Sequence, residues 1–274
     1  MCRLMAINKE GLKLVESTIG LLKLLDHLER DCGGHGNGFV LVKDGKIKTI
    51  KKGVKLTNKE IAYSIRNSDF DYAFYHTRVA SVGARTDNNC HPYWQYGKKS
   101  FLMMNGTESA FKGIANQMNI TDTEAIYKIM EEFDLEPSFL TNLSSRFMGF
   151  KNGKVFIVNS SYSGLEFIRD KNAFVVASNF PKWVKAEQME IGLWTQGQTI
   201  RSKYSSDSWV QRGSYTGGNK YKSNKDKTLD EIRKSGVFID DSYVDSAADD
   251  YFDSVDDYED DYSWNRLKKK YDIK

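Results

Sequence analysis

The chain has 274 residues, of which 40% are hydrophobic and 28% are charged. At roughly 150 residues per domain, this length allows one or two domains with a sizeable core. No uncharged apolar run approaches the roughly 18 residues that a membrane-spanning helix needs, and the N-terminus lacks the regions of a signal peptide. These features argue against an integral membrane protein, and we expect a cytoplasmic chain.

The net charge of +3 combines two opposed blocks. Residues 238–274 hold 12 Asp/Glu against 5 Lys/Arg, so this tail carries −7 and the body before it +10. The lysines of the body are dispersed and do not form a stripe with interleaved aromatic residues, which argues against nucleic-acid binding.

Only three cysteines and four histidines occur, and they show neither CxxC nor HExxH spacing. This set argues against a disulfide framework and against a metal site. The glycine-rich GGHGNG at 33–38 lacks the GK[ST] of a P-loop and precedes a predicted strand, so phosphate binding is not expected either. We therefore expect no metal and no cofactor.

Short strands and amphipathic helices alternate along residues 1–195. One helical stripe predicts a helix over 11–30, formed by Leu12, Val15, Ile19, Leu22 and Leu25. The Asp-Gly pair at 44–45 predicts a hairpin. Because strands come in hairpins and helices in separate groups, the pattern favours an α+β layered fold over a doubly wound parallel sheet. Strands are predicted at 3–7, 38–42, 46–51, 71–75, 101–104, 155–159 and 173–177.

The remaining chain has a different composition. Residues 196–237 are rich in Gly, Ser and Lys, which predicts a linker with a short helix at 228–236, where Thr228 and Glu231 have capping-box spacing. Residues 238–274 form an acidic, aromatic tail, whose first part, 238–262, holds eleven acids and no Lys or Arg. Such a composition repels itself, so we predict that the tail is disordered in isolation.

Cys2 is the first residue that suggests chemistry. A small side chain at this position normally permits removal of Met1, which would leave a thiol and a free α-amine on one residue. An α-amine with a pKa of about 7.7 to 8.0 can accept the thiol proton. Alternatively, Cys2 is a small apolar residue that begins an edge strand.

Two further segments place polar groups beside predicted strands. Arg78, in YHTRVASVGARTDNNCHPY at 75–93, has a guanidinium that can hold a carboxylate through two bonds, or it is a surface arginine. Asn105 and Gly106 follow an apolar strand. A side-chain amide and a glycine N–H placed together there can form an oxyanion hole, although Asn-Gly is also common in tight turns.

A fourth segment begins a predicted helix. Thr121 and Glu124 have capping-box spacing, and Asp122 lies in the first turn. The helix dipole favours a carboxylate there by about 0.3–1 kcal/mol, which gives Asp122 a purely structural interpretation as well as a functional one.

In this order and at this spacing, the motifs resemble those of the class II glutamine amidotransferases, the glutaminase domains of the N-terminal-nucleophile hydrolase superfamily. The resemblance covers residues 2 to about 180 and rests on MCRL, GGHGNGF, HTRVASVGARTDNNCHPY, MNG, TDTE and ASN. Many members have His where Met104 stands, Thr where Ser81 stands and an acid where Asn179 stands. The implied fold is a four-layer αββα sandwich, which agrees with the α+β pattern.

The resemblance implies catalytic roles for Cys2, Asn105 and Gly106. Cys2 would attack the side-chain amide of L-glutamine, with its own α-amine as the base. The Asn105 side chain and the Gly106 N–H would stabilise the oxyanion. Water would then hydrolyse the γ-glutamyl thioester to glutamate after ammonia has left.

The resemblance also implies substrate-binding roles for Arg78, Ser81 and Asp122. Arg78 would hold the α-carboxylate of glutamine and Asp122 its α-ammonium. The loop 79–89, which contains Ser81, would close over the site.

The function implied by the resemblance is hydrolysis of glutamine to supply ammonia. Family members usually carry a synthetase or transferase domain, and none is visible after residue 195. We therefore expect a separate synthetase or ligase subunit that activates the acceptor, docked through the helix at 228–236 or the acidic tail. Two alternatives stay open: a stand-alone amidase or γ-glutamyl hydrolase with the same Cys2 chemistry, and a catalytically silent binding protein.

Overall fold

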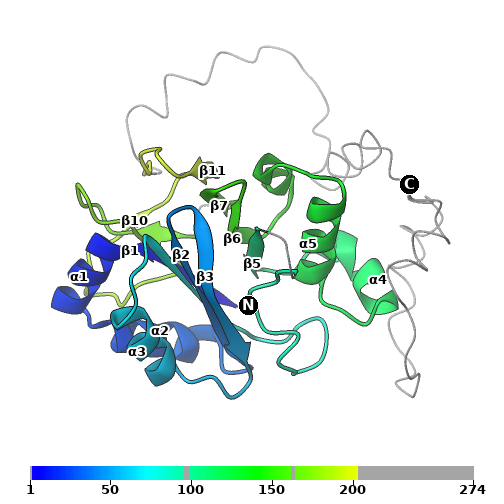
Figure 1. Ribbon diagram of the computed structural model, residues 1–274, viewed down its shortest axis with the longest axis horizontal. Coiled ribbons are helices and arrows are strands. Elements are labelled where there is room, and N and C mark those ends of the chain that lie inside the picture. Colours follow the sequence, from blue (N-terminus) through cyan, green and yellow to red (C-terminus); the bar gives the residue numbers. More distant parts are fainter. Residues whose placement is uncertain (1, 96–98, 162–163, 203–274) are drawn as a thin grey trace, which may run out of the picture.

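Two antiparallel sheets form the centre of the protein (Figure 1). The computed structural model describes residues 2–95, 99–161 and 164–202. In this part of the chain, the larger sheet has seven strands in the order β10-β8-β9-β1-β4-β2-β3, and the smaller has four in the order β11-β7-β6-β5. β3 and β10 are thus the edges of the first sheet, and β5 and β11 the edges of the second.

The elements have the following bounds. The strands are β1 (Arg3–Asn8), β2 (Asn37–Lys43), β3 (Lys46–Gly53), β4 (Tyr72–Thr77), β5 (Phe101–Asn105), β6 (Arg146–Lys151), β7 (Lys154–Asn159), β8 (Glu166–Phe167), β9 (Val175–Ala177), β10 (Glu187–Gln188) and β11 (Gly192–Thr195). The helices are α1 (Lys9–Thr18), α2 (Leu21–Cys32), α3 (Asn58–Arg66), α4 (Ser109–Gln117), α5 (Asp122–Glu132) and the 3₁₀ helix η1 (Pro137–Asn142).

Three apolar layers hold these elements together. One lies between the larger sheet and helices α1–α3, a second lies between the two sheets, and a third lies between the smaller sheet and helices α4, α5 and η1. Figure 1 shows the two groups of helices on opposite sides of the strands. The arrangement is a four-layer αββα sandwich, which confirms the predicted fold class.

Strand alternation decides which side chains enter the space between the sheets. In β1, Leu4 and Ala6 join the layer between the sheets, whereas Met5 and Ile7 face the helices. In β5, Met103 lies between the sheets and Leu102 faces α5. Cys2 lies two positions before Leu4, and Asn105 lies two positions after Met103. By the same alternation, Cys2 and Asn105 face the space between the sheets.

Most predicted strands are present, and the predicted hairpin is confirmed. Lys43 pairs with Lys46 across the turn, and both Asp44 and Gly45 have positive φ, 50° and 63°, as a tight hairpin turn requires. The sequence pattern gave no signal for β6, β8, β10 or β11. Three of these four strands have only two to four residues, too few for an alternation to be recognised.

The single helix predicted over 11–30 is wrong. The apolar stripe is shared by two helices, α1 and α2, which separate at Gly20. Gly20 has φ 84° and ψ 127°, a conformation that side-chain-bearing residues rarely adopt. The hydrophobic spacing continues across the break because both helices pack on the same face of the larger sheet.

Part of the predicted linker can be followed. Within 196–202, the Gln196 N–H donates to Val155 O, and the Glu190 N–H donates to Arg201 O, so these residues are bonded to the sandwich. The rest of the linker, the helix at 228–236 and the tail at 238–274 lie outside the described residues. Among the residues that are described, no helix has the length and apolar content to cross a membrane.

The break at Gly20 leads to a first prediction. We expect Gly20→Ala to lower the free energy of unfolding by about 1–2 kcal/mol, because a Cβ is unfavourable at this backbone conformation. The space itself is open, since a Cβ would meet only carbons of Lys23 at 3.8 and 3.9 Å. Urea denaturation measures the effect. Lys23→Ala is the control and should stay within about 0.5 kcal/mol of wild type; equal stability of both variants would contradict the backbone explanation.

Candidate functional site

Cys2 lies immediately before β1 and is 7% exposed. Its Sγ accepts a hydrogen bond from the Val79 N–H at 3.4 Å and is 3.6 Å from Val79 O. Burial raises the pKa of the thiol, while the bond from Val79 and the charge of Arg78 act in the opposite direction. The charge of Asp122 also acts on this thiol and favours its neutral form. Cys2 therefore contacts the start of the loop 79–89 and lies within reach of the charges of Arg78 and Asp122.

Arg78 follows β4 and is buried, not a surface arginine. Its Nη1 donates to Ala84 O at 2.8 Å, and its Nη2 donates to Val82 O at 2.8 Å and Gly83 O at 3.1 Å. The guanidinium thus holds the middle of the loop 79–89 against the end of β4. A guanidinium has five N–H donors, so this arrangement leaves donors for another acceptor.

Asp122 is the first residue of α5 and is also buried. The predicted N-cap before it is present, since Thr121 Oγ1 accepts from the Glu124 N–H. The Asp122 carboxylate accepts from the N–H groups of Glu108 and Thr123, both at 2.9 Å. Burial raises the pKa of Asp122, and these two backbone bonds lower it. Asp122 therefore serves the start of α5 while its charge also reaches Cys2.

Asn105 ends β5, and its side-chain amide crosses from one sheet to the other. Its Nδ2 donates to Ser178 Oγ at 3.0 Å, and the same oxygen accepts from the Leu4 N–H at 2.9 Å. Ser178 follows β9 in the larger sheet. Asn105 Oδ1 is buried and has no hydrogen-bond partner among the described residues. One hydroxyl thus connects the amide of Asn105 to the strand that begins after Cys2.

Gly106 continues the chain with φ 148°. A Cβ at this position would lie 2.1 Å from Ser145 Oγ, so only glycine fits. Asn105 and Gly106 are therefore not the tight turn that the dipeptide also allowed. They form the end of a strand whose next residue, Thr107, contacts the loop: Ser81 Oγ lies 3.0 Å from Thr107 Oγ1.

The glycine-rich segment 33–38 pairs with the Arg78 segment. The His35 N–H donates to Arg78 O, the Arg78 N–H donates to Gly36 O, and the Ala80 N–H donates to His35 Nδ1. A Cβ at Gly36 would lie 2.3 Å from Cys90 Sγ. The glycines here permit close backbone packing that fixes Arg78, a structural reason for the motif in place of phosphate binding.

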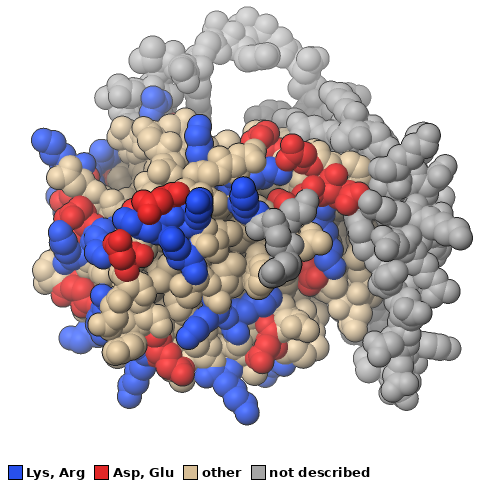
Figure 2. All heavy atoms as spheres, viewed as in Figure 1, with Lys and Arg blue, Asp and Glu red and all other residues tan. Residues whose placement is uncertain are grey.

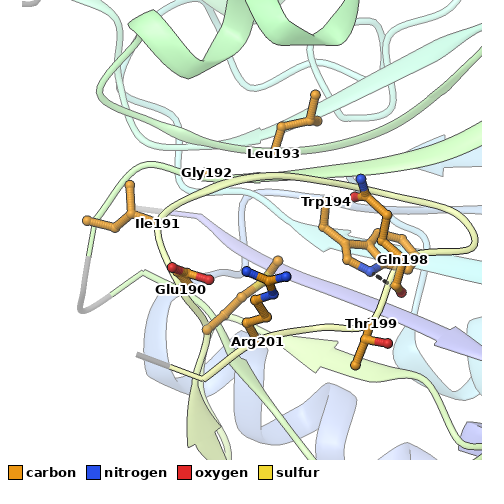
Figure 3. A pocket seen from close by; sticks show the side chains of 9 residues that line it. Glu190, Ile191, Gly192, Leu193, Trp194, Gln198, Thr199 and Arg201 are labelled. Carbon is orange, nitrogen blue, oxygen red and sulfur yellow. Dashed lines mark hydrogen bonds between the residues drawn. The ribbon is translucent and has the colours of Figure 1, made fainter. Parts of the chain in front are cut away.

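The structure brings all six sequence-predicted site residues into one connected region, listed here as Cys2, Arg78, Ser81, Asn105, Gly106 and Asp122. A separate pocket of about 470 Å³ is lined by residues of β11 and its neighbours (Figure 3). Figure 3 shows Glu190, Trp194 and Arg201 around it, and none of the six residues lines it.

On the face shown in Figure 2, lysines and arginines are interspersed with acidic side chains.

The chain is similar in sequence to part of two known enzymes. No protein-family model matches the chain. The glutamine–fructose-6-phosphate aminotransferase (isomerizing) of Sulfurisphaera tokodaii is 30% identical over 149 residues, and that of Sulfolobus acidocaldarius is 30% identical over 145 residues. Each match covers 48% of this chain and 24% of the relative, so the chain spans about a quarter of these relatives. Over about half of its length, the chain is thus similar to glutamine amidotransferases of class II.

Two solved structures are also similar to the chain. The glutamine phosphoribosylpyrophosphate amidotransferase of B. subtilis aligns with a TM-score of 0.46 at 18% identity, over 65% of this chain and 42% of that chain. A glutamine aminotransferase class-II domain protein from Silicibacter pomeroyi aligns with a TM-score of 0.46 at 16% identity, over 73% of this chain and 99% of that chain.

The sequence did not indicate roles for three buried polar residues near the predicted site: Ser178, His76 and Glu108. Glu108 accepts from the Ser145 N–H and the Ser144 hydroxyl while its own N–H binds Asp122. Ser178 and His76 lie within the motifs ASN and HTRVASVGARTDNNCHPY, and Glu108 lies two residues after MNG. Only the fold shows that their side chains join segments far apart in sequence.

Ser178 gives a second prediction. Ser178→Ala removes the acceptor of the Leu4 N–H and of Asn105 Nδ2, so we expect the free energy of unfolding to fall by about 1–3 kcal/mol. The control is Ser17→Ala in α1, which removes only an exposed bond to Leu14 O and should change stability by less than about 0.5 kcal/mol. Urea denaturation of both variants checks this, and a Ser178→Ala chain as stable as wild type would contradict the bridging role.

Proposed function

We propose that the amidotransferase domain hydrolyses the side-chain amide of L-glutamine, with Cys2 as the nucleophile, and releases glutamate and ammonia. The position of the Cys2 thiol carries this proposal. The thiol accepts a hydrogen bond from the Val79 N–H at the end of the space between the sheets. The charges of Arg78 and Asp122 both act on its pKa. A thiol, a cation and an anion are the groups that an enzyme needs to cleave the amide of a zwitterion.

The first step is attack of Cys2 Sγ on the amide carbon. Removal of Met1 places the α-amine on Cys2 itself, where it takes the thiol proton. This base matters because burial raises the pKa of the thiol, so the thiol needs an adjacent acceptor to become a thiolate. The proton then passes to the leaving nitrogen, the C–N bond of the tetrahedral intermediate breaks, and ammonia departs and leaves a γ-glutamyl thioester on Cys2. Water hydrolyses the thioester and restores the thiol.

The oxyanion of the tetrahedral intermediates is assigned to Asn105 and Gly106. One N–H of Asn105 Nδ2 is held by Ser178 Oγ, and the second N–H remains for the substrate oxygen. The Gly106 N–H is the other donor. In comparable sites, removal of one such donor costs about 2.7–4 kcal/mol of transition-state stabilisation.

Arg78 and Asp122 select the amino-acid end of the substrate. Arg78 receives the α-carboxylate and Asp122 the α-ammonium, so that glutamine is distinguished from a simple amide. Both side chains are less than 5% exposed. Entry of glutamine therefore requires movement of the loop 79–89, whose carbonyls are bound to Arg78 and whose Ser81 lies against Thr107.

Cys2→Ala tests the proposal directly. We expect wild type to form glutamate and ammonia from glutamine and Cys2→Ala to lose this activity by at least about 10³-fold, because no other nucleophile replaces the thiol. Cys32→Ala is the matched control and should retain activity. Mass spectrometry shows whether Met1 has been removed, and a glutamine-like diazoketone should label Cys2 only.

Outcomes that contradict the proposal are specific. Activity retained in Cys2→Ala excludes this nucleophile, and a retained Met1 in an active enzyme excludes the α-amine as base. Faster release of ammonia from N-substituted γ-glutamyl amides than from glutamine would identify an amidase in place of an amidotransferase.

We also propose that a separate synthetase or ligase subunit receives the ammonia and docks on the segment 228–274. In the sequence, a Gly/Ser/Lys-rich stretch is followed by a capped helix motif and then by eleven acids in 238–262. This composition is typical of segments that fold on binding. Deletion of 228–274 should preserve basal glutaminase activity and abolish both co-purification of the partner from the native source and its stimulation of ammonia formation. A truncated chain that still forms the complex would contradict this docking.

A further inference from the structure

Two buried histidines hold the main chain of Met104. His76 lies in β4, and His91 lies beyond the loop 79–89. Their rings are stacked, with centroids 3.9 Å apart and planes at 24°. His76 Nε2 is 3.1 Å from Met104 O, and the Met104 N–H donates to His91 Nδ1 at 3.2 Å. Each ring thus binds one of the two polar groups of a single residue.

These bonds fix the protonation of both rings. A carbonyl oxygen only accepts, so His76 carries a proton on Nε2. A backbone N–H only donates, so His91 Nδ1 is unprotonated and its proton lies on Nε2. Burial and the nearby charge of Arg78 lower the pKa of both imidazoles, that of His76 to about 3 even though its bond to Met104 O acts in the opposite direction. Lys52 also acts on His91 in the same direction.

The two histidines bind β5 at a place where its backbone needs partners from outside its own sheet. β5 is an edge strand that pairs only with β6 in its sheet. On its free side, Leu102 exchanges two backbone bonds with Tyr93. Two residues further on, Met104 exchanges two bonds with the side chains of His76 and His91. The imidazoles take the place of a neighbouring strand at the last point before Asn105 and Gly106.

We propose that His76 and His91 are positioning residues, which fix the end of β5 and thereby aim the Asn105 amide and the Gly106 N–H at the reacting carbonyl. This inference rests on the proposed glutaminase function. Met104 is bonded directly to Asn105, so rotation of its peptide would redirect both donors. Neutral rings hold the peptide without adding a charge beside Arg78.

Pairs of variants separate the hydrogen bonds from the packing. In His76→Gln the amide nitrogen occupies the position of Nε2, and in His91→Asn the amide oxygen occupies the position of Nδ1, so each keeps its bond to Met104. His76→Asn and His91→Gln place these atoms elsewhere and lose the bond. We expect kcat for glutamine to stay within about 3-fold of wild type in the first pair and to fall about 10- to 100-fold in the second, with KM changed by less than about 3-fold.

A second readout does not depend on activity. Amide hydrogen exchange at Asn105 and Gly106 should be at least about 10-fold faster in His76→Asn and His91→Gln than in wild type, while circular dichroism remains that of the folded protein. Unchanged exchange and unchanged kcat in these two variants would overturn the proposal. An equal loss in all four variants would also overturn it, since the packing of the rings would then be what matters.

The activity of the wild type distinguishes failure of the positioning role from failure of the proposed glutaminase function. A wild-type chain that does not hydrolyse glutamine contradicts the glutaminase, and with it the assignment of a catalytic target for the two histidines. An active wild type combined with fully active His76→Asn and His91→Gln contradicts the positioning role alone.

Discussion

The hydrogen bonds at Ser178 Oγ join the two sheets at the end where Cys2 lies. Leu4, in the larger sheet, donates to this oxygen, and so does Asn105, at the end of β5 in the smaller sheet. In the apolar layer the sheets meet through side chains such as Phe74, Met103 and Met148, which fix the spacing but no direction. A hydrogen bond is directional, so Ser178 sets the distance and orientation of Asn105 relative to the strand that follows Cys2.

The buried charges of this region are tolerated because each is satisfied locally. Arg78 donates to three carbonyls of the loop, Asp122 accepts from two backbone N–H groups, and Glu108 accepts from Ser144 and Ser145. A buried ion without such partners is strongly destabilising. The same bonds couple Arg78 to the loop 79–89 and Asp122 to the start of α5. Under the proposed function, the α-carboxylate of glutamine has to replace loop carbonyls at Arg78.

Local signals in the sequence were sufficient for most of the longer elements and insufficient for the connections between them. The Asp44-Gly45 turn and the Thr121 cap depend on a few neighbouring residues, and both are present as predicted. The break at Gly20 was missed because the apolar periodicity continues through it. His76 and His91 could not be paired from sequence, since stacking depends on how β4 and the segment after the loop approach β5. Each of the six predicted site residues belongs to a recognisable motif, whereas Ser178 acts through atoms 174 and 73 residues away in the chain.

Two departures from the family pattern become intelligible in this geometry. Met104 stands where many members have His, and its side chain packs with Leu102, Phe111 and Phe147 toward the helices, away from Asn105. Only its N–H and C=O bind the two histidines, so a different side chain here alters the packing against the helices and leaves the backbone bonds in place.

Asn179, which stands in place of an acid, donates from Nδ2 to Asp31 Oδ2 at 2.8 Å, and Arg3 binds the same oxygen. A carboxylate at position 179 would bring a second negative charge against Asp31 and compete for Arg3. Arg3 also donates to Cys2 O at 3.1 Å. The amide at position 179 therefore supports the single Asp31–Arg3 ion pair that holds the backbone of the proposed nucleophile.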